Sequence, residues 1–232
     1  MAPDYPGFGH SSAPAASEWS YTFDHLADVI DHLLDSLGRT RYAIYVNDYG
    51  APVGFRLAVR HPDRITGIIT QNGNAYEDGL TSFWSDLRKI WSNPSEADLA
   101  PLRANLTREA THWQYTDGVP DVSLVNPDKE ALDQALLDRP GNEEIQLALF
   151  LNYATNVAAY PVWQEYLRTH QPPVLAVWGK NDAIFGPDGA TAFTRDVKNA
   201  QVHLLDTGHF ALETHRPAIA ALTRTFLHSL PA

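Results

Sequence analysis

The decisive stretch of this sequence is Tyr42-Ala43-Ile44-Tyr45-Val46-Asn47-Asp48-Tyr49-Gly50. Its first five residues form the apolar run of a buried strand, and the segment from Pro52 to His61 predicts a helix directly afterwards. Asp48 therefore stands at a sharp strand-to-helix turn, where the following backbone N–H groups point towards whatever its carboxylate attacks. Such a turn is a nucleophile elbow, with Asp in the place usually held by Ser. An ordinary Asp-Tyr-Gly turn after a strand is the alternative.

Two further polar residues follow at the ends of later strands. Asp182 comes after the apolar run 172–178, and His209 comes after the short run 201–205. In an open α/β sheet, ligands bind outside the carboxyl ends of the strands. We therefore expect Asp48, Asp182 and His209 on one rim, in the chain order nucleophile, acid, histidine. The alternative for His209, one of ten histidines, is a turn residue with locally satisfied nitrogens.

The remaining periodicity predicts an α/β fold with a mostly parallel sheet. Residues 23–37 place their apolar side chains on one helical face, and Gly38 is a fitting C-terminal cap. The run 65–70 is a second buried strand, so the chain around Asp48 forms a βαβ unit. Gly54 in the intervening helix would let that helix lie close to the sheet.

The segment from residue 74 to about residue 160 has a different character. It is rich in Trp, Asn, Asp and Pro and contains no strand-like run. Trp84, Leu87 and Trp91 recur at helical spacing. We expect a helical cap over the elbow, inserted between a first core part at residues 1–73 and a second core part at residues 161–232. A second helical domain without a catalytic role is the alternative.

Composition indicates a globular enzyme whose partner is neither nucleic acid nor membrane. A length of 232 residues suits one α/β domain with an insertion, and a net charge of −11 without a basic run argues against both partners. The absence of cysteine excludes disulfides and thiolate chemistry. The sequence shows no metal-ligand spacing and no cofactor motif, so we predict neither. No apolar run approaches the ~20 residues of a membrane span and no signal pattern is visible, which predicts a cytoplasmic protein.

These motifs resemble the α/β-hydrolase superfamily, specifically its branch with an aspartate nucleophile, the epoxide hydrolases and haloalkane dehalogenases. The matching segments are Ala2–Gly9 for the loop after the family's fourth strand, Asp48–Gly50 for its elbow, Gly179–Asp182 for its acid turn and Gly208-His209 for its histidine turn. The resemblance implies that Asp48 attacks an electrophilic carbon, His209 activates water against the resulting ester, and Asp182 orients the imidazole. It also implies oxyanion or substrate contacts at Asn47 and Tyr49.

Aromatic residues of the expected cap supply the remaining candidates. In epoxide hydrolases lid tyrosines protonate the opening oxirane oxygen, and Tyr153 lies near the place of such a tyrosine, although cap packing explains it equally well. Tyr115 is a second candidate for this acid, and Tyr76 is a weaker one. With Trp84 and Tyr115 as substrate contacts, the cap fits a small apolar organic substrate. The same composition also fits simple packing.

Two features depart from the family pattern. Members carry three strands before the Pro-Asp-Tyr-Pro-Gly loop and a His-Gly-x-Pro turn that helps to bind the oxyanion, whereas Met1 directly precedes that loop region here and the turn does not occur. We therefore expect the N-terminal strands to be absent, the 42–46 strand to present an open edge for oligomer formation, and ester hydrolysis to be impaired. Haloalkane dehalogenases also typically have Trp after the nucleophile. Tyr49 in that place weakens the dehalogenase hypothesis without excluding it.

Several functions therefore stay open. An epoxide-hydrolase-like enzyme acting through an aspartyl ester is the leading hypothesis, and a haloalkane-dehalogenase-like hydrolase is the second. A shortened, catalytically impaired hydrolase with a residual role in binding or assembly is the third. A ligand receptor with the hydrolase fold is a further alternative, which nothing in the sequence specifically favours.

Overall fold

The computed structural model describes residues 1–91 and 94–231 of the chain. Its strands are β1 (Tyr42–Asn47), β2 (Ile65–Gln71), β3 (Val174–Gly179) and β4 (Gln201–Leu205). Its helices are α1 (Phe23–Ser36), α2 (Gly50–Arg60), α3 (Trp84–Trp91), α4 (Glu96–Arg103), α5 (Arg108–Thr116), α6 (Pro127–Leu137), α7 (Asn142–Asn152), α8 (Ala154–His170), α9 (Pro187–Asp196) and α10 (Ala211–Ser229). The predicted strand–helix–strand unit around Asp48 is thus confirmed as β1–α2–β2.

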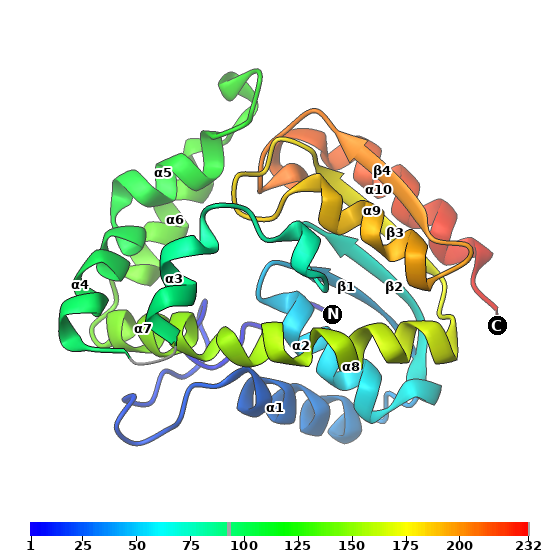
Figure 1. Cartoon of the computed structure of the whole chain (residues 1–232), viewed down its shortest axis with the longest axis horizontal. Coiled ribbons are helices and arrows are strands. Elements are labelled where there is room, and N and C mark those ends of the chain that lie inside the picture. Colours follow the sequence, from blue (N-terminus) through cyan, green and yellow to red (C-terminus); the bar gives the residue numbers. More distant parts are fainter. Residues whose placement is uncertain (92–93, 232) are drawn as a thin grey trace.

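The four strands form one parallel sheet in the order β1-β2-β3-β4 (Figure 1). The register pairs Asn47 with Gln71, and Gly179 with Leu205. Because paired parallel strands end side by side, the residues that follow them gather on one rim of the sheet. The predicted α/β architecture with a parallel sheet is confirmed.

The two faces of the sheet are buried by different helices. Ile68, Ala176 and Trp178 belong to the large core formed with α1, α2, α8 and α9. The alternate residues, including Leu175 and Val177, belong to a smaller core with α10. This division follows from the period of two along a strand, and near-continuous apolar runs are typical of strands buried on both faces.

Helix α2 approaches β1 closely because residue 54 is glycine. A Cβ atom at Gly54 would lie 2.5 Å from Val46 Cγ1 and 3.2 Å from Ile44 Cδ1. Val46 is 4% exposed and β-branched, so it has little freedom to move away. The predicted role of this glycine is therefore confirmed.

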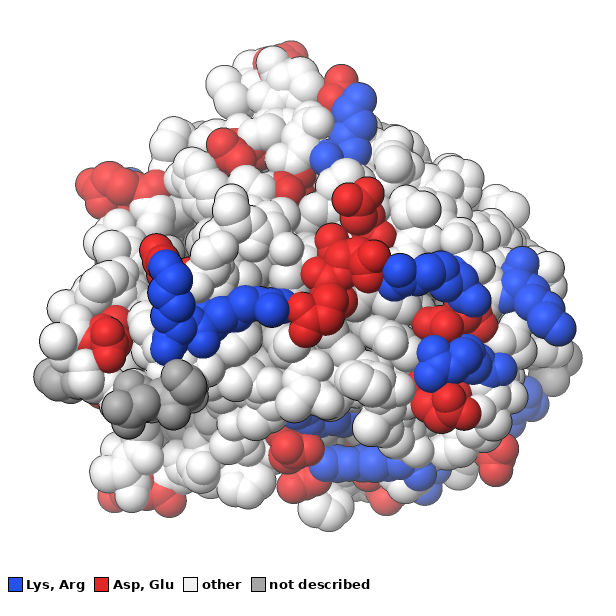
Figure 2. Space-filling view, in the orientation of Figure 1, with Lys and Arg blue, Asp and Glu red and all other residues white. Residues whose placement is uncertain are grey.

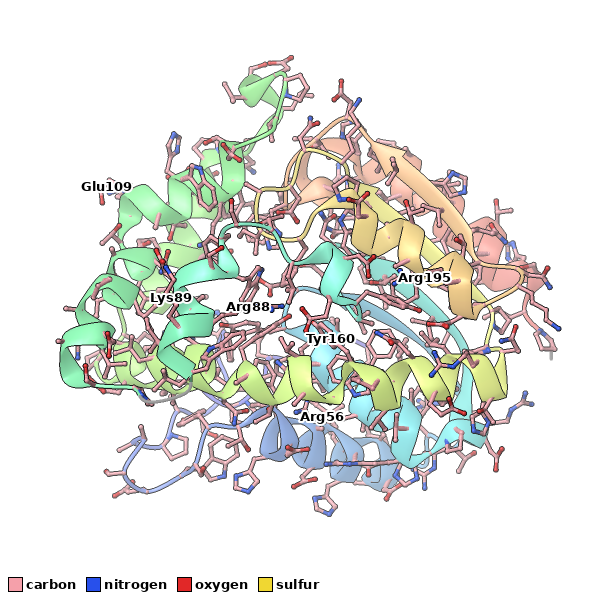
Figure 3. The ribbon with its side chains drawn as sticks, in the orientation of Figure 1. Arg56, Arg88, Lys89, Glu109, Tyr160 and Arg195 are labelled. Atoms are coloured by element: carbon pink, nitrogen blue, oxygen red, sulfur yellow. The ribbon has the colours of Figure 1, made fainter. Side chains whose placement is uncertain are left out.

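A buried guanidinium connects the helices on this face. Arg56 of α2 donates to Asp24 Oδ1 at 2.9 Å and to Asn156 Oδ1 of α8 at 2.6 Å. Figure 3 shows it between α1 and α8, and its guanidinium lies 5.7 Å from the Trp163 ring centroid. Burial lowers the pKa of Arg56, which the hydrogen bond and charge of Asp24 partly offset. The buried cation is thus both paired and covered by an aromatic ring.

Six α-helices, α3 to α8, stand between β2 and β3, and the described part of this segment contains no strand. Figure 1 shows α3 to α6 gathered beyond the arrowheads of the strands. A bridge between Leu80 and Phe185 ties the start of the segment to the loop after β3. Helix α8 continues to His170, past residue 160 where the expected insertion ends. The assignment of this segment as a separate cap stays a prediction.

Strand β1 is an edge strand within the described residues. Tyr45 on it is 41% exposed, and a groove of about 350 Å³ lined by Met1, Pro3 and Tyr42 runs along the strand. The open edge expected from the sequence is therefore present. Association of two chains through it stays a prediction.

The outer surface carries interspersed charges on the face that Figure 2 shows. Arg195 pairs with Asp78 at 2.7 Å, and Arg168 pairs with Asp196 at 3.0 Å. Among the described residues, no helix combines the length and the apolar character needed to cross a membrane.

Replacing Gly54 by alanine tests the close contact of α2 with β1. We expect Gly54→Ala to lower the free energy of unfolding by about 1–3 kcal/mol, because the added methyl group overpacks the contact with Val46. Chemical denaturation measures this change. Gly50→Ala is the matched control, since its Cβ would lie 3.8 Å from the nearest side-chain atom. Equal stability of both variants would contradict the overpacking argument.

Candidate active site

Asp48 occupies a strained turn between β1 and α2. Its φ angle is +44°, in the left-handed region that favours glycine, and its side chain is 32% exposed. Helix α2 follows at once and has no capping side chain. Among its first residues, Ala51 donates its N–H to the Asp48 carbonyl at 2.9 Å and Pro52 has no N–H, so the N–H groups of Tyr49 and Gly50 are the ones left for an anion at this turn. The turn has the properties of the predicted elbow.

The structure brings Asp48, Asp182 and His209 together. His209 Nδ1 lies 2.8 Å from Asp182 Oδ2, and His209 Nε2 lies 3.3 Å from Asp48 Oδ2. The Asp182 side chain is fully buried and that of His209 is 3% exposed, so Asp48 is the most accessible of the three. This arrangement can hold an imidazole between an orienting carboxylate and a reactive one.

The two carboxylates decide the protonation of His209. Burial by itself lowers the pKa of the imidazole, but the charges and hydrogen bonds of Asp182 and Asp48 outweigh burial and raise the pKa from 6.5 to about 10. The resting site therefore contains a protonated imidazole at neutral pH. A raised folded-state pKa stabilises the fold fully below pH 6.5, and this contribution is lost as the pH rises through about 10.

Two carboxamides that the sequence analysis missed position the triad. Asn72 Nδ2 donates to Asp182 Oδ2 at 2.7 Å, and Asn72 Oδ1 accepts from Gly179 N–H at 2.9 Å. Gln71 Nε2 donates to the His209 carbonyl at 3.0 Å. Gln71 is the last residue of β2 and Asn72 directly follows it, on the rim that carries the triad, and this position is the signal that could have revealed them. The φ angle of Asn72, +48°, could not be read from the sequence.

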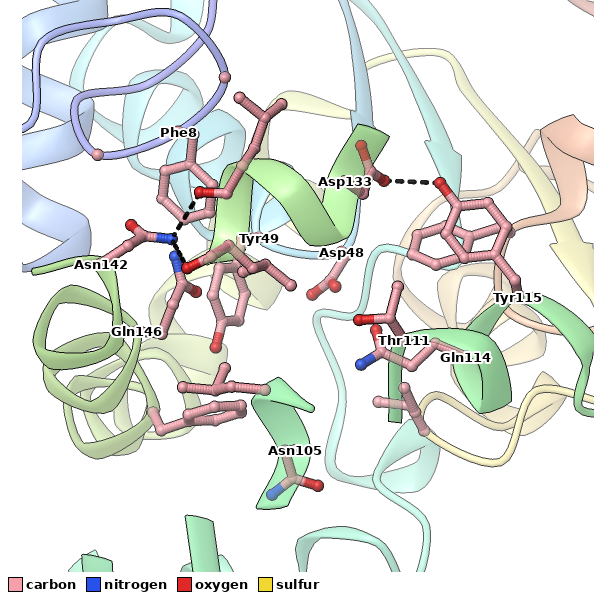
Figure 4. Close-up of a pocket in the computed structure, with 18 of the residues that line it drawn as sticks. Phe8, Asp48, Tyr49, Asn105, Thr111, Gln114, Tyr115, Asp133, Asn142 and Gln146 are labelled. Atoms are coloured by element: carbon pink, nitrogen blue, oxygen red, sulfur yellow. Dashed lines mark hydrogen bonds between the residues drawn. The ribbon is translucent and has the colours of Figure 1, made fainter. Parts of the chain in front are cut away.

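A pocket of about 510 Å³ opens in front of Asp48 (Figure 4). Its core side includes Asp48, Tyr49 and Phe210. Its opposite walls come from the helical segment, with Trp84 from α3, Thr111, Gln114 and Tyr115 from α5, Asp133 from α6, and Asn142, Gln146 and Phe150 from α7. The nucleophile candidate thus faces a cavity roofed by the helices between β2 and β3.

Three of the predicted contact residues line this pocket. Tyr49 is placed directly after Asp48. The Trp84 indole N–H donates to the Ile184 carbonyl at 2.9 Å, and the Tyr115 hydroxyl donates to Asp133 Oδ2 at 2.6 Å. The polar hydrogens of Trp84 and Tyr115 are therefore committed within the protein. Both side chains contribute shape and apolar surface to the pocket.

Asn47, Tyr153 and Tyr76 are not among the residues that line the pocket. Asn47 Nδ2 donates to the Gln71 carbonyl at 2.7 Å, which makes it a cross-strand contact between β1 and β2. The Tyr76 hydroxyl donates to Asp196 Oδ2 at 2.8 Å. Asn47, expected as an oxyanion or substrate contact, and Tyr76, the weaker acid candidate, thus each donate to an acceptor within the fold and lie outside the pocket lining.

Tyr153 lies at the junction of α7 and α8 and is fully buried. Its ring centroid is 4.3 Å from that of Trp84 and 6.0 Å from that of Tyr49, and its hydroxyl lies 3.5 Å from the Tyr160 hydroxyl. The residue is therefore packed among aromatic rings beside the pocket. Burial, the neighbouring Tyr160 and the charge of Asp48 raise the pKa of Tyr153. The assignment of Tyr153 as an acid stays a prediction.

Among the described residues, no three His, Asp or Glu side chains lie close enough together to hold a metal ion. The buried carboxylate of Asp182 is instead engaged by a histidine, by Asn72 and by the backbone N–H of Ile184 at 2.7 Å.

Sequence comparison finds related hydrolases. A family model for the alpha/beta hydrolase fold matches residues 1–216. An uncharacterized hydrolase of Saccharomyces cerevisiae is 47% identical over 224 residues, which are 95% of this chain and 77% of that protein. Haloalkane dehalogenase 2 of Mycobacterium tuberculosis is 29% identical over 199 residues, or 81% of this chain and 63% of that protein.

Structural comparison finds the same fold in solved proteins. The haloalkane dehalogenase DbeA of Bradyrhizobium elkani superimposes with a TM-score of 0.73 at 23% identity, covering 98% of this chain and 80% of that one. A meta-cleavage product hydrolase of Pseudomonas fluorescens, CumD, gives a TM-score of 0.70 at 19% identity, covering 98% and 78%. At these identities the likeness concerns the fold alone.

Removing the charge of Asp48 tests the electrostatics of the site. We expect Asp48→Asn to lower the pKa of His209, because the variant loses one of the two carboxylates that raise it. NMR titration of the imidazole measures the change, and the loss of stability between pH 6.5 and about 10 should shrink with it. Asp133→Asn is the control, since that carboxylate lines the same pocket but bonds Tyr115. An unchanged pKa of His209 in Asp48→Asn would show that the charge of Asp48 does not raise it.

Proposed function

The chain belongs to the α/β-hydrolase family and has its fold, and on that premise we propose that it hydrolyses an electrophilic sp³ carbon through an ester on Asp48. The observation that carries the proposal is a carboxylate at the elbow, facing a pocket of about 510 Å³, with His209 Nε2 at 3.3 Å. A carboxylate is already deprotonated and can attack in line without a base. A serine at the same turn would need His209 for its activation.

In the first step, one carboxylate oxygen of Asp48 attacks the carbon. A carbon–oxygen ester bond forms, and the bond to the leaving group breaks with its electron pair. We assign stabilisation of the leaving group to the hydroxyl of Tyr49, a residue that follows the nucleophile directly and lines the same pocket. Burial and the charge of Asp48 hold the pKa of Tyr49 well above 10, so the phenol stays protonated and donates.

In the second step, His209 acts as the base. Ester formation removes the negative charge of Asp48, and with it one of the causes that keep the imidazole protonated. The imidazole releases its proton to solvent, takes a proton from water, and the resulting hydroxide attacks the ester carbonyl. The oxyanion accepts from N–H groups at the start of α2, and the alcohol leaves with the proton of the imidazole. Asp182 orients His209 throughout.

We propose a carbon–halogen bond as the first substrate class. The relative that supports it is the haloalkane dehalogenase of Mycobacterium tuberculosis, 29% identical over 199 residues. A departing halide needs a hydrogen bond but no proton, which the phenol of Tyr49 can supply. The epoxide hypothesis depended on a cap tyrosine that protonates the oxirane oxygen. This support is weaker because Tyr153 is outside the pocket lining and the hydroxyl of Tyr115 donates to Asp133.

Epoxide opening is the second candidate, favoured by one observation. The residue after Asp48 is a phenol, and a phenol can transfer a proton to a developing alkoxide. In both reactions the helical segment between β2 and β3 would serve as a cap that covers a small, mainly apolar substrate.

Trapping of the ester tests the mechanism. His209→Gln should accumulate the ester on Asp48 because the variant lacks the base for the second step. Intact-protein and peptide mass spectrometry after incubation with 1,2-dibromoethane or styrene oxide measures the adduct and its position. The control is His209→Gln combined with Asp48→Ala, which should give none. An adduct on another residue, or none with either probe, would refute the aspartyl mechanism.

Removing the Tyr49 hydroxyl tests its assignment. We expect Tyr49→Phe to lower turnover by about 10²-fold, the usual loss for one donor to developing charge, with bromide release and diol formation as the readouts. Tyr153→Phe is the control and should retain turnover, because the hydroxyl of Tyr153 contacts Tyr160. A large loss of turnover in Tyr153→Phe with little loss in Tyr49→Phe would instead identify Tyr153 as the acid.

A further inference from the structure

Three segments that are far apart in the chain meet beside the triad. They are the residues directly after α5, the turn after β3 that contains Asp182, and the turn after β4 that leads to His209. Figure 1 shows the loop after β3 reaching the end of α5. The side chain of Asn181 connects all three, because its Nδ2 donates to the Gly118 carbonyl at 2.8 Å and to Asp206 Oδ1 at 3.0 Å.

The backbones of these segments also touch one another. The N–H of Asn181 donates to the Thr207 carbonyl at 3.1 Å. Gly118 has a φ of +70°, and a Cβ atom there would lie 2.5 Å from the carbonyl oxygen of Asn181. A Cβ atom at Gly208 would overlap with the carbonyl oxygen of Asp117. The end of α5 is therefore in direct contact with the turns after β3 and β4, and the contact has no room for side chains at these two glycines.

The amide group of Asn181 suits its two acceptors. Nδ2 carries two hydrogens, and one acceptor is a backbone carbonyl whereas the other is the carboxylate of Asp206. The hydrogen bond from Asn181 and the hydrogen bond from Lys180 lower the pKa of Asp206, so this acceptor is charged at neutral pH. Leucine has nearly the shape of asparagine and lacks the hydrogens, so Asn181→Leu removes both bonds at little change in volume.

The contact joins one wall of the pocket to two members of the triad. Helix α5 contributes Tyr115 and other side chains to the pocket lining. On the other side, Asn181 directly precedes Asp182, whose Oδ2 lies 2.8 Å from His209 Nδ1. Ring packing adds a second connection, since the ring centroid of Phe210 lies 4.6 Å from that of Tyr115 and 4.7 Å from that of His209. A shift of α5 would thus displace the Asp182–His209 pair as well.

We propose that Asn181 is a positioning residue, which fixes the Asp182–His209 pair relative to the α5 wall of the pocket. Asn181 is not among the residues that line the pocket, so it acts through Asp182 and His209. The role rests on the proposed function, because it concerns the second step, in which His209 takes a proton from the water that attacks the ester. Asp48 stands on the separate turn between β1 and α2, so the first step does not depend on Asn181.

Rapid-quench mass spectrometry of the whole chain with 1,2-dibromoethane or styrene oxide separates the two steps. We expect Asn181→Leu to slow hydrolysis of the ester on Asp48 about tenfold, because a misplaced imidazole activates water less well, and the ester then accumulates during turnover. Formation of the ester, measured with His209→Gln also present, should keep its rate. Asn199→Leu, the same change at an exposed position before β4, should alter neither step. Equal slowing of both steps by Asn181→Leu, or slowing of neither, would overturn the proposal.

Gly118→Ala tests the same contact from the α5 side and leaves the side chain of Asn181 in place. The added methyl group would press on the carbonyl oxygen of Asn181, so we expect the same slow ester hydrolysis. Gly141→Ala is the matched control. Its φ of +80° gives a comparable backbone strain, but nothing lies within 4 Å of its Cβ atom. Equal hydrolysis rates in the two alanine variants would show that the contact with Asn181 does not position the pair.

NMR titration of His209 tests the positioning role without any substrate. The charge and hydrogen bond of Asp182 are among the causes that hold the pKa of His209 at about 10, so a displaced Asp182 in Asn181→Leu should lower it. Asn199→Leu should leave this pKa unchanged. A lowered pKa together with no ester on Asp48 in any variant would refute the aspartyl mechanism and retain the positioning role. An ester on Asp48 with an unchanged pKa and unchanged hydrolysis in Asn181→Leu would do the opposite.

Discussion

Parallel pairing of the four strands is the constraint on which the rest of this structure depends. Each strand ends on the same rim. Residues far apart in the chain therefore come together there because of strand pairing, and not because of direct contacts between their side chains. Asp48 follows β1, Asn72 follows β2, and Asp182 follows β3. A register slip of one residue would turn every strand side chain to the opposite face and misplace the loops that follow.

His209 connects the electrostatics of this rim to its chemistry. Two carboxylates raise its pKa, and of these the Asp182 side chain is fully buried whereas that of Asp48 is 32% exposed. In the proposed mechanism, the charge of Asp48 disappears when the ester forms on it. The site can therefore hold a cation while the nucleophile is free and a neutral base while the nucleophile is occupied. No movement of the backbone is needed for this change.

Aromatic packing decides which polar groups reach the substrate. Trp84, Tyr153 and Phe185 form one cluster of rings beside the pocket, and the Trp84 indole N–H is used within it. The remaining polar groups of the pocket wall come from α5 to α7. Packing thus commits the polar hydrogen of Trp84 to a contact inside the protein, although its ring lines the pocket.

The sequence by itself determined the strands, the helix after Asp48 and the chain order of Asp48, Asp182 and His209. These features follow from local periodicity and from the position of each residue after an apolar run. It also predicted the helical nature of the segment between β2 and β3. The triad was predictable because parallel strands place their ends together whatever the details of side-chain packing.

Only the tertiary structure decided which candidates face the pocket. Tyr153 is turned among rings from distant segments, Asn47 is held by the β2 carbonyl of Gln71, and Asn72 reaches Asp182 through a left-handed turn. The direction of a side chain depends on contacts between residues far apart in the chain, and no local pattern encodes them.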